Sequence, residues 1–404
     1  MVYSRDCMNT KIQTLSDRYG RRLLDFDHIE KICTRKENFI PYIQAYPWDT
    51  TSLSHGLPGL ACLFSELEIQ TQDPLWAHAT HTCIEKILHG LKERGVNHDA
   101  LFSGLSGICF SISIASIHGQ RYNKLLLKLH NYLLFILDDK LPYLIKQQEV
   151  TSSTLSSMTY DYVTGISGVL SYLLASVTKD NSEKYIVHIL HFLTQLSSDS
   201  KNLFNLPEHM IREEERKSFP SGYFDTGFAH GVSGVLAILS KALIMGYEVE
   251  GQEKAIRTLV GQIKSLQTTF EGLQEVWPPK IAPSGEKQGT TAYRDGWCYG
   301  RPGISYSLLQ ASSALRDISL KQYSIDTMAS CIQTNESTPT VSCYSFCHGL
   351  SSLLVASHLS YKATEESVFA NATKRFATLI LSKENPDLPF GFKSLAFGNN
   401  KDFL

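Results

Sequence analysis

The chain has 404 residues and a formal net charge of −2 at neutral pH, and hydrophobic residues make up 43% of it. This apolar fraction suffices for a large buried core, and the length fits two or three ordinary domains or one large helical solenoid or toroid. The nearly neutral charge, without a long basic run, argues against a nucleic-acid-binding protein and against a protein that binds anionic membrane surfaces.

The first 30 residues are mixed and charged, without the apolar core of a secretory signal. No apolar stretch approaches the roughly 20 residues that a membrane span needs. We therefore expect a cytoplasmic protein. The chain has nine cysteines, an odd number that argues against a disulfide framework in a reducing compartment. Most of these thiols lie in apolar surroundings as small core residues, and the others are candidates for metal binding or catalysis.

A short glycine motif recurs six times along the chain, and each copy opens an apolar run of helical length. The first glycines of the six copies are Gly56, Gly104, Gly165, Gly231, Gly300 and Gly349. All copies but the last have a second glycine three residues later. The runs that follow are apolar nearly all round, which is typical of helices that are buried on most sides.

Amphipathic helix patterns alternate with these apolar runs. The clearest patterns cover residues 75–94, 121–146, 182–198 and 252–269, and weaker ones cover 13–34, 318–334 and 363–382. In 252–269, for example, apolar residues recur at spacings of three and four, as one face of a helix requires. The repeating unit is thus an amphipathic outer helix followed by an apolar inner helix. Such units predict an all-α fold of the α/α toroid type, a double ring of inner and outer helices.

Two intervals between these helices are too long for a simple connection. Residues 199–228 contain a charged run, and residues 270–296 contain several prolines and glycines. Because long ordered loops in a compact domain often carry function, we expect long loops or small insertions here that can include short strands. We expect both intervals to belong to one domain that spans residues 1–404.

The end of the chain departs from the repeat. Seven amphipathic helices accompany only six glycine motifs, because the chain stops at Leu404 before a seventh motif. The inner ring is therefore predicted to lack its seventh helix at the C-terminus.

Two motif copies carry residues that can bind a metal. Cys298 lies just before the fifth motif glycine, and Cys347 and His348 directly precede the sixth. Thiolate and imidazole are ligands that zinc prefers, and three protein ligands leave a fourth position for water or substrate. The sequence thus predicts a zinc site at these three residues. Cys343 is a rival ligand, but it lies outside the register of the glycine motif.

Four segments together resemble the LanC-like family of class I lanthipeptide cyclases. The segments are Tyr160–Gly165 (YDYVTG), Ala229–Gly234 (AHGVSG), Trp297–Gly303 (WCYGRPG) and Cys347–Gly349 (CHG). One such match is weak, but four in this order, from roughly residue 50 to the end, are specific.

The resemblance implies a double-ring α/α toroid with one zinc ion at its centre. It also implies a lanthionine synthetase, a carbon–sulfur bond-forming enzyme of lantibiotic biosynthesis. Its reaction adds cysteine thiols of a dehydrated peptide to dehydroalanine or dehydrobutyrine and closes (methyl)lanthionine thioether rings.

The resemblance implies roles for four further residues. His230, directly before a motif glycine, would be the general acid that protonates the enolate carbon. Asp161 would orient or tune this histidine, and Arg294 and Tyr299 would stabilise the anionic intermediate. From the residues alone, His230 and Asp161 can instead be helix caps, and Tyr299 can belong to the scaffold. His55 has the same register as His230, but the resemblance gives it no role.

The resemblance also implies partners and a location. The substrate would be a dehydrated lanthipeptide precursor with its leader, and the cognate dehydratase and exporter would be protein partners. The enzyme would act in the cytoplasm, peripherally at the inner face of the membrane within a biosynthetic complex, and without nucleic acid.

Three other classes of function stay open. A zinc-dependent protein prenyltransferase would need a carboxylate ligand and a Lys/Arg-rich diphosphate site, and no such cluster lies near the motifs. An inverting glycosidase on the same scaffold would need two carboxylates, and only Asp161 has a suitable register. A non-catalytic relative that binds zinc and thiols such as glutathione would differ from a cyclase only in its failure to close rings.

Overall fold

The computed structural model describes residues 5–41, 44–150, 155–176, 181–270, 272–283, 293–337, 339–341, 343–395 and 402–403. The chain groups into two compact units. The smaller unit comprises Met1–Leu133, Ala175–Thr178 and Thr378–Leu404, and the larger one comprises Leu134–Leu174 and Lys179–Ala377. The described residues are mostly helical, as the sequence predicts, and none of their helices has the length and apolar character needed to cross a membrane.

The smaller unit is built around α3 (Leu57–Thr71), the helix that follows the first glycine motif. The helices that pack against it are α1 (Arg5–Arg22), α4 (Pro74–Arg94) and α5 (Leu105–Ala115). Phe64 of α3 stacks on Trp76 of α4 with ring centroids 5.7 Å apart, and neither side chain is exposed. The helix α6 (Asn123–Val150) begins in this unit and ends in the larger one.

The helix predicted over residues 13–34 is two helices in the structure, α1 and α2 (Phe26–Cys33). The second helix begins after Asp25, whose side chain accepts a hydrogen bond from the backbone N–H of His28 at 3.0 Å. Such an N-cap satisfies a donor that the first turn leaves unpaired. The cap therefore starts a new helix within a pattern that periodicity alone reads as one.

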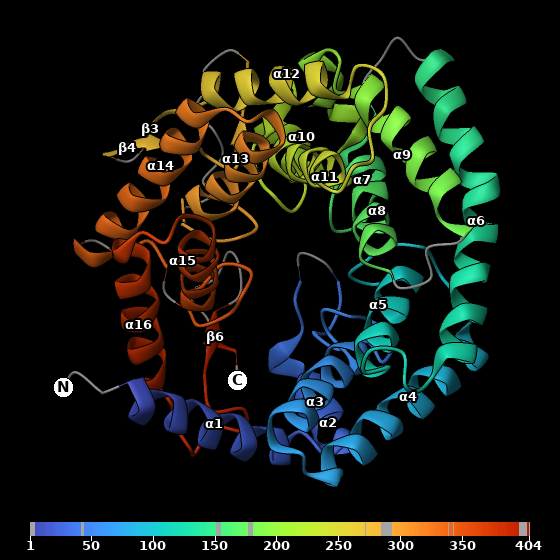
Figure 1. The fold of residues 1–404 in the computed structure, drawn as a ribbon, viewed down its shortest axis with the longest axis vertical. Coiled ribbons are helices and arrows are strands. Elements are labelled where there is room, and N and C mark those ends of the chain that lie inside the picture. Colours follow the sequence, from blue (N-terminus) through green and yellow to red (C-terminus); the bar gives the residue numbers. More distant parts are fainter. Residues whose placement is uncertain are drawn as a thin grey trace. The chain divides into compact units, whose positions relative to one another are not determined.

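In the larger unit, the helices that follow glycine motifs lie inside the amphipathic ones (Figure 1). The inner helices are α8 (Ile166–Ala175), α11 (Val232–Ile244), α13 (Arg301–Leu315) and α15 (Leu350–Thr364). The outer helices are α9 (Glu183–Leu196), α12 (Gln252–Ser265), α14 (Ile318–Ser337) and α16 (Ser367–Leu381). In α11, 10 of 13 residues are buried, against 6 of 14 in α12. This difference confirms that the nearly all-apolar runs are the inner helices.

The glycine motif folds the preceding loop back onto the first turn of its inner helix. A Cβ at Gly231 would lie 2.3 Å from the carbonyl oxygen of Asp225, which leaves no room for any side chain. Two residues later, the hydroxyl of Ser233 donates to the carbonyl of Thr226 at 2.7 Å. The same bond across seven residues recurs as Ser106–Asp99, Ser167–Tyr160 and Ser351–Tyr344. The motif thus holds the residue before the glycine at the start of an inner helix.

The two long intervals meet in one small sheet. The strands β1 (Phe204–Asn205), β2 (Tyr223–Asp225) and β5 (Lys280–Ile281) form an antiparallel sheet in the order β1-β2-β5. The short helix α10 (Glu213–Ser218) lies within the charged run of the first interval, and another short helix, α7 (Ser157–Tyr160), precedes α8. A separate hairpin consists of β3 (Thr268–Phe270) and β4 (Leu273–Val276). Residues 284–292 of the second interval lie outside the described residues.

Six inner-type helices, α3, α5, α8, α11, α13 and α15, follow the six glycine motifs. After α16, the described residues contain only two short strands, β6 (Ser394–Leu395) and β7 (Asp402–Phe403), which pair with each other. Residues 396–401 and Leu404 lie outside the described part of the chain.

Candidate metal centre

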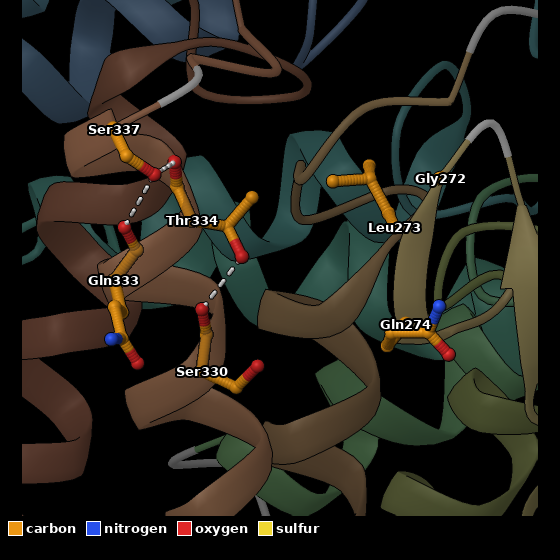
Figure 2. A pocket seen from close by; sticks show the side chains of 7 residues that line it. All are labelled: Gly272, Leu273, Gln274, Ser330, Gln333, Thr334 and Ser337. Carbon is orange, nitrogen blue, oxygen red and sulfur yellow. Dashed lines mark hydrogen bonds between the residues drawn. The ribbon is translucent and has the colours of Figure 1, made fainter.

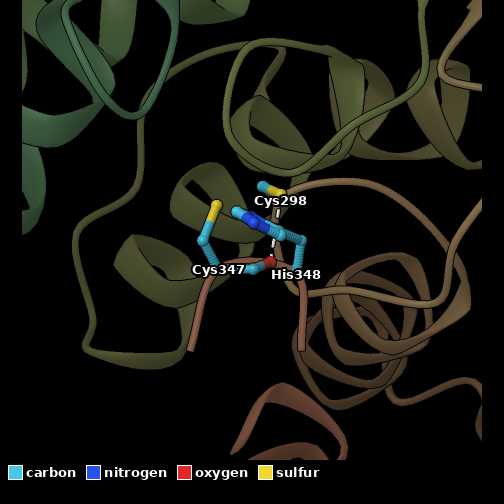
Figure 3. A group of neighbouring side chains, drawn as sticks. All are labelled: Cys298, Cys347 and His348. Atoms are coloured by element: carbon cyan, nitrogen blue, oxygen red, sulfur yellow. Dashed lines mark hydrogen bonds between the residues drawn. The ribbon is translucent and has the colours of Figure 1, made fainter. Parts of the chain in front are cut away.

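Two loops of the larger unit bring Cys298, Cys347 and His348 together (Figure 3). One ligand atom from each residue can be chosen so that all three lie within 4.8 Å of one another. The backbone N–H of Cys298 donates to the carbonyl oxygen of Cys347 at 3.1 Å, and the Cys298 thiol donates to the same oxygen at 3.0 Å. A Cβ at Gly296 would lie 2.8 Å from this oxygen, so the two loops approach too closely for any other residue there.

This group fits a zinc ion in both donor chemistry and spacing. Zinc takes thiolate sulfur at about 2.3 Å and imidazole nitrogen at about 2.0–2.1 Å, so tetrahedral ligand atoms lie roughly 3.5–4 Å apart. The three atoms need only small side-chain adjustments to reach that spacing. Two sulfurs and one nitrogen leave one position of a tetrahedron for an outside ligand.

The contact between the two thiols separates their pKa values. Hydrogen bonding with Cys298 lowers the pKa of Cys347 to about 5, although burial acts in the other direction. The same contact, together with burial, raises the pKa of Cys298. Burial lowers the pKa of His348, but hydrogen bonds with Cys343 and Cys347 outweigh it and raise the value to about 9. The Cys298–Cys347 pair therefore carries one thiolate near neutral pH. A cysteine must be in this deprotonated form to bind a metal.

Cys343 lies beside this group but is not part of it. Its Sγ is 3.3 Å from the Ser345 hydroxyl and 3.8 Å from the carbonyl oxygen of His348. Burial raises the pKa of this thiol, but hydrogen bonds with His348 and Ser345 outweigh it and lower the value to about 7. These contacts hold Cys343 against the loop that carries Cys347 and His348.

Asp161 and His230 form a hydrogen-bonded pair in the same unit. Oδ2 of Asp161 lies 2.6 Å from Nδ1 of His230, and Asp161 is 0% exposed whereas the His230 side chain is 39% exposed. Oδ1 of Asp161 accepts the backbone N–H groups of Val163, Thr164 and Gly165 at 3.0, 2.6 and 2.8 Å. The carboxylate thus caps its own loop with one oxygen and holds the imidazole with the other.

The surroundings of His230 favour its protonated form. Burial lowers its pKa, but the hydrogen bond with Asp161 and the charges of Asp161 and Asp225 outweigh burial and raise it above the ordinary value. Because Nδ1 faces the carboxylate, Nε2 is the nitrogen that can act on a substrate.

Tyr299 and Arg294 also lie near the cysteine pair. The ring of Tyr299 has its centroid 6.5 Å from that of His230, and its hydroxyl donates to Oδ2 of Asp225 at 3.0 Å. Arg294 is half-buried. Contact with Cys347 and burial raise the pKa of Cys298, and Arg294 is close enough for its positive charge to act in the opposite direction. All seven residues that the sequence singles out therefore lie in the larger unit, on the loops that lead into α8, α11, α13 and α15.

Comparisons with known proteins agree with this arrangement. The profile described as lanthionine synthetase C-like protein matches residues 47–398. The chain belongs to the lanthionine synthetase C-like family. It is 27% identical over 334 residues to the nisin biosynthesis protein NisC of Lactococcus lactis subsp. lactis, over 80% of this chain and 75% of NisC. It is also similar to a solved structure named nisin cyclase, with a TM-score of 0.74 and 23% identity over 91% of this chain and 88% of that one. This structural match confirms the predicted fold class, the α/α toroid.

A buried ion pair supports the Cys298 loop of this lanthionine synthetase C-like chain. Nη2 of Arg301 lies 2.7 Å from Oδ2 of Asp295, and the two side chains are 1% and 0% exposed. Asp295 also accepts hydrogen bonds from Tyr293, Asn335 and Thr340. Sequence analysis missed this pair. An arginine in the first turn of an apolar helix, against the helix dipole, was the one local sign of a buried anionic partner.

A pocket of about 300 Å³ lies elsewhere in the larger unit, between α14 and the β3–β4 hairpin (Figure 2). Its lining residues are Gly272, Leu273, Gln274, Ser330, Gln333, Thr334 and Ser337. None of them is titratable, and the hydroxyls of Thr334 and Ser337 donate to backbone carbonyls of α14 itself. The pocket thus offers no titratable side chain for acid–base chemistry.

Proposed function

We propose that this chain is a zinc-dependent lanthionine synthetase that adds peptide cysteine thiols to dehydroalanine or dehydrobutyrine and closes (methyl)lanthionine rings. The observation that carries the proposal is the convergence of Cys298, Cys347 and His348 near the Asp161–His230 pair. Membership of the lanthionine synthetase C-like family and similarity to NisC support the same reaction class.

Cys298, Cys347 and His348 would hold the zinc ion. When bound, zinc supplies a positive charge that favours the thiolate form of a substrate cysteine at the open position near neutral pH. The chain's own contribution is to hold the ligands ready. The hydrogen bond from the backbone N–H of Cys298 to the Cys347 carbonyl joins the two ligand loops, and the glycine motifs fix each loop on its helix.

His230 would protonate the carbon of the enolate that thiol addition produces. Its partly exposed side chain can reach a substrate, and its raised pKa favours the protonated form of the ring. Asp161 holds Nδ1, so the proton that leaves comes from Nε2 and the neutral ring stays hydrogen-bonded through its Nδ1–H. The three backbone N–H groups on the other oxygen of Asp161 keep this carboxylate in place.

Arg294 would stabilise the negative charge that develops on the enolate oxygen, because its positive charge already acts on the neighbouring Cys298 thiol. Tyr299 would line the same space beside His230. The substrate would be a dehydrated precursor peptide with its leader, supplied by a cognate dehydratase and passed to an exporter in the cytoplasm.

The ligand chemistry separates this proposal from the other classes. The metal-binding group that the described residues form contains no carboxylate, unlike the ligand set of a prenyltransferase site. The carboxylates Asp161 and Asp225 are buried, and both oxygens of each accept hydrogen bonds from the protein. This arrangement does not suit the acid and base of a glycosidase, which must reach substrate and water. A non-catalytic thiol-binding relative would share the site, and ring closure separates it from a cyclase.

The test is in vitro cyclisation of a dehydrated lanthipeptide precursor peptide. After incubation with zinc-loaded protein, free thiols are alkylated with N-ethylmaleimide and counted by mass spectrometry. We expect the thiols to be lost to ring formation with wild-type protein and retained with Cys298→Ala. A wild-type protein that binds zinc and peptide but leaves every thiol open to alkylation would instead be a thiol-binding protein.

A further inference from the structure

A second buried carboxylate, Asp225, lies beside the site, and the reaction described above uses only the effect of its charge on the pKa of His230. It is the last residue of β2 and is 3% exposed. Its Oδ1 accepts the backbone N–H of Gly227 at 2.9 Å, and its Oδ2 accepts the hydroxyl of Tyr299 at 3.0 Å. One donor to this carboxylate is thus a phenol whose ring belongs to the site.

The segment that follows Asp225 also holds the Tyr299 ring. A Cβ at Gly227 would lie 2.5 Å from Cε1 and 2.6 Å from Cδ1 of that ring, so the ring rests directly on the glycine. The same segment continues to His230, whose ring centroid is 6.5 Å from that of Tyr299. A single short loop therefore carries the carboxylate, the glycine surface and the histidine that surround the phenol.

The Asp225–Tyr299 pair repeats the arrangement of the Asp161–His230 pair. In both pairs, a buried aspartate uses one oxygen to accept backbone N–H from its own loop, three groups at Asp161 and one at Asp225, and the other oxygen to hold a ring from a different loop. The two rings that are held in this way lie next to each other. Buried hydrogen bonds of this kind fix the orientation of site residues.

We propose that Asp225 is a positioning residue that holds the Tyr299 ring against His230 through the Tyr299 hydroxyl and so shapes the space in which the enolate is protonated. This inference rests on the proposed function and deepens it. A phenol has one O–H donor, and in Tyr299 that donor is committed to Asp225. Tyr299 is therefore not the proton donor to the substrate, and this role is left to His230.

Three single variants and one double variant test the inference. We expect Asp225→Ala and Tyr299→Phe each to lower kcat for ring closure by roughly 10- to 100-fold, because a misplaced ring spoils the geometry of proton transfer. KM and zinc content should stay near wild type. The double variant should be no slower than the slower single variant, because both changes break the same contact. Asp225→Asn keeps an oxygen that can accept the phenol and should recover most of the rate.

Tyr223→Phe is the matched control. Tyr223 lies on the same strand as Asp225, is buried, and donates its hydroxyl to a different carboxylate, Oε1 of Glu215, at 2.9 Å. Its loss should lower the melting temperature but leave kcat unchanged. If Asp225→Ala behaves like this control and keeps the wild-type kcat, Asp225 is only structural and the inference is wrong.

Two other results need a different measurement to decide the inference. If Asp225→Ala does not fold, Tyr299→Phe carries the test, and an unchanged kcat in that variant overturns the inference. If wild-type protein closes no rings, the proposed function fails, and crystal structures of Asp225→Asn and Tyr299→Phe decide the inference alone. A ring at position 299 in its wild-type place in Tyr299→Phe would show that the hydroxyl contact positions nothing, whereas a displaced ring would support the positioning role.

Discussion

His55 and His230 occupy the same position in two copies of the glycine motif, one in each compact unit. His55 is exposed, and its Nδ1 lies 2.7 Å from the hydroxyl of the preceding residue, Ser54. Nδ1 of His230 instead lies 2.6 Å from a buried carboxylate, Asp161, that comes from another loop. The motif supplies the position of the histidine, whereas the buried partner gives it a fixed orientation and a raised pKa.

The scaffold of the glycine motif itself differs much less between the two units. In the smaller unit, the motif hydroxyl of Ser106 donates to the Asp99 carbonyl at 2.6 Å, and in the larger unit that of Ser233 donates to Thr226 at 2.7 Å. Both serines are fully buried. The repeat thus builds the same loop in both units, and the chemistry depends on the residues just before the glycine and on their buried partners.

The largest expected effect separates the two histidines. His230→Asn should lower kcat for ring closure by roughly 10²- to 10⁴-fold, because it removes the proton donor. Zinc content should stay near wild type. His55→Asn, the matched change at the same position of the smaller unit, should leave kcat within twofold of wild type, roughly the scatter of such measurements. Rates are measured by thiol alkylation, and ring stereochemistry by chiral analysis of the hydrolysed product.

Equal losses in the two variants would contradict the comparison, because register alone would then determine function. An unchanged rate and stereochemistry in His230→Asn would remove this histidine from the mechanism.

The next prediction concerns stability and compares one ion pair from each unit. Asp295→Ala leaves the fully buried Arg301 guanidinium without its carboxylate, which should cost about 3–5 kcal/mol of unfolding free energy. Glu384→Gln in the smaller unit breaks a pair with Arg18, whose side chain is 47% exposed, and should cost about 1 kcal/mol or less. Urea denaturation of the two variants gives both values. Similar costs would mean that the network under Cys298 is no more important than a surface pair.

The smallest effect tests whether the scaffold is equivalent in the two units. Ser106→Ala and Ser233→Ala each leave one buried carbonyl with one hydrogen bond fewer, at an expected cost of about 1 kcal/mol in each case. Neither change should lower kcat substantially, because the backbone contacts of the motif remain. A cost confined to Ser233→Ala would show that only the loops of the larger unit depend on the motif.

Sequence periodicity predicts the parts of this fold that local contacts determine. The six glycine motifs and the apolar runs behind them predict the inner helices, and the structure confirms them at α3, α5, α8, α11, α13 and α15. The same register brings Cys298, Cys347 and His348 into one group. Their roles, the single domain over residues 1–404 and the absence of a seventh inner helix stay predictions.

The contacts that sequence analysis missed join segments far apart in the chain. The pairing of β2 with β5 joins the two long intervals, and neither interval carries a pattern that names its partner. Asp225 lies within the first interval, where nothing in its neighbours indicates the contact with Tyr299. Within a single helix pattern, the cap at Asp25 was overlooked because periodicity continued past it. Partners of this kind depend on tertiary packing, which a single sequence does not encode locally.

The central claim is that a metal binds between the loops before α13 and α15, and the zinc content of purified variants tests it most directly. We expect about one zinc ion per chain in wild-type protein and in Cys343→Ala, because this thiol lies outside the ligand group. Cys298→Ala, Cys347→Ala and His348→Ala should each lose most of the metal when measured by inductively coupled plasma mass spectrometry. Full metal content in these three variants, together with loss in Cys343→Ala, would contradict the account.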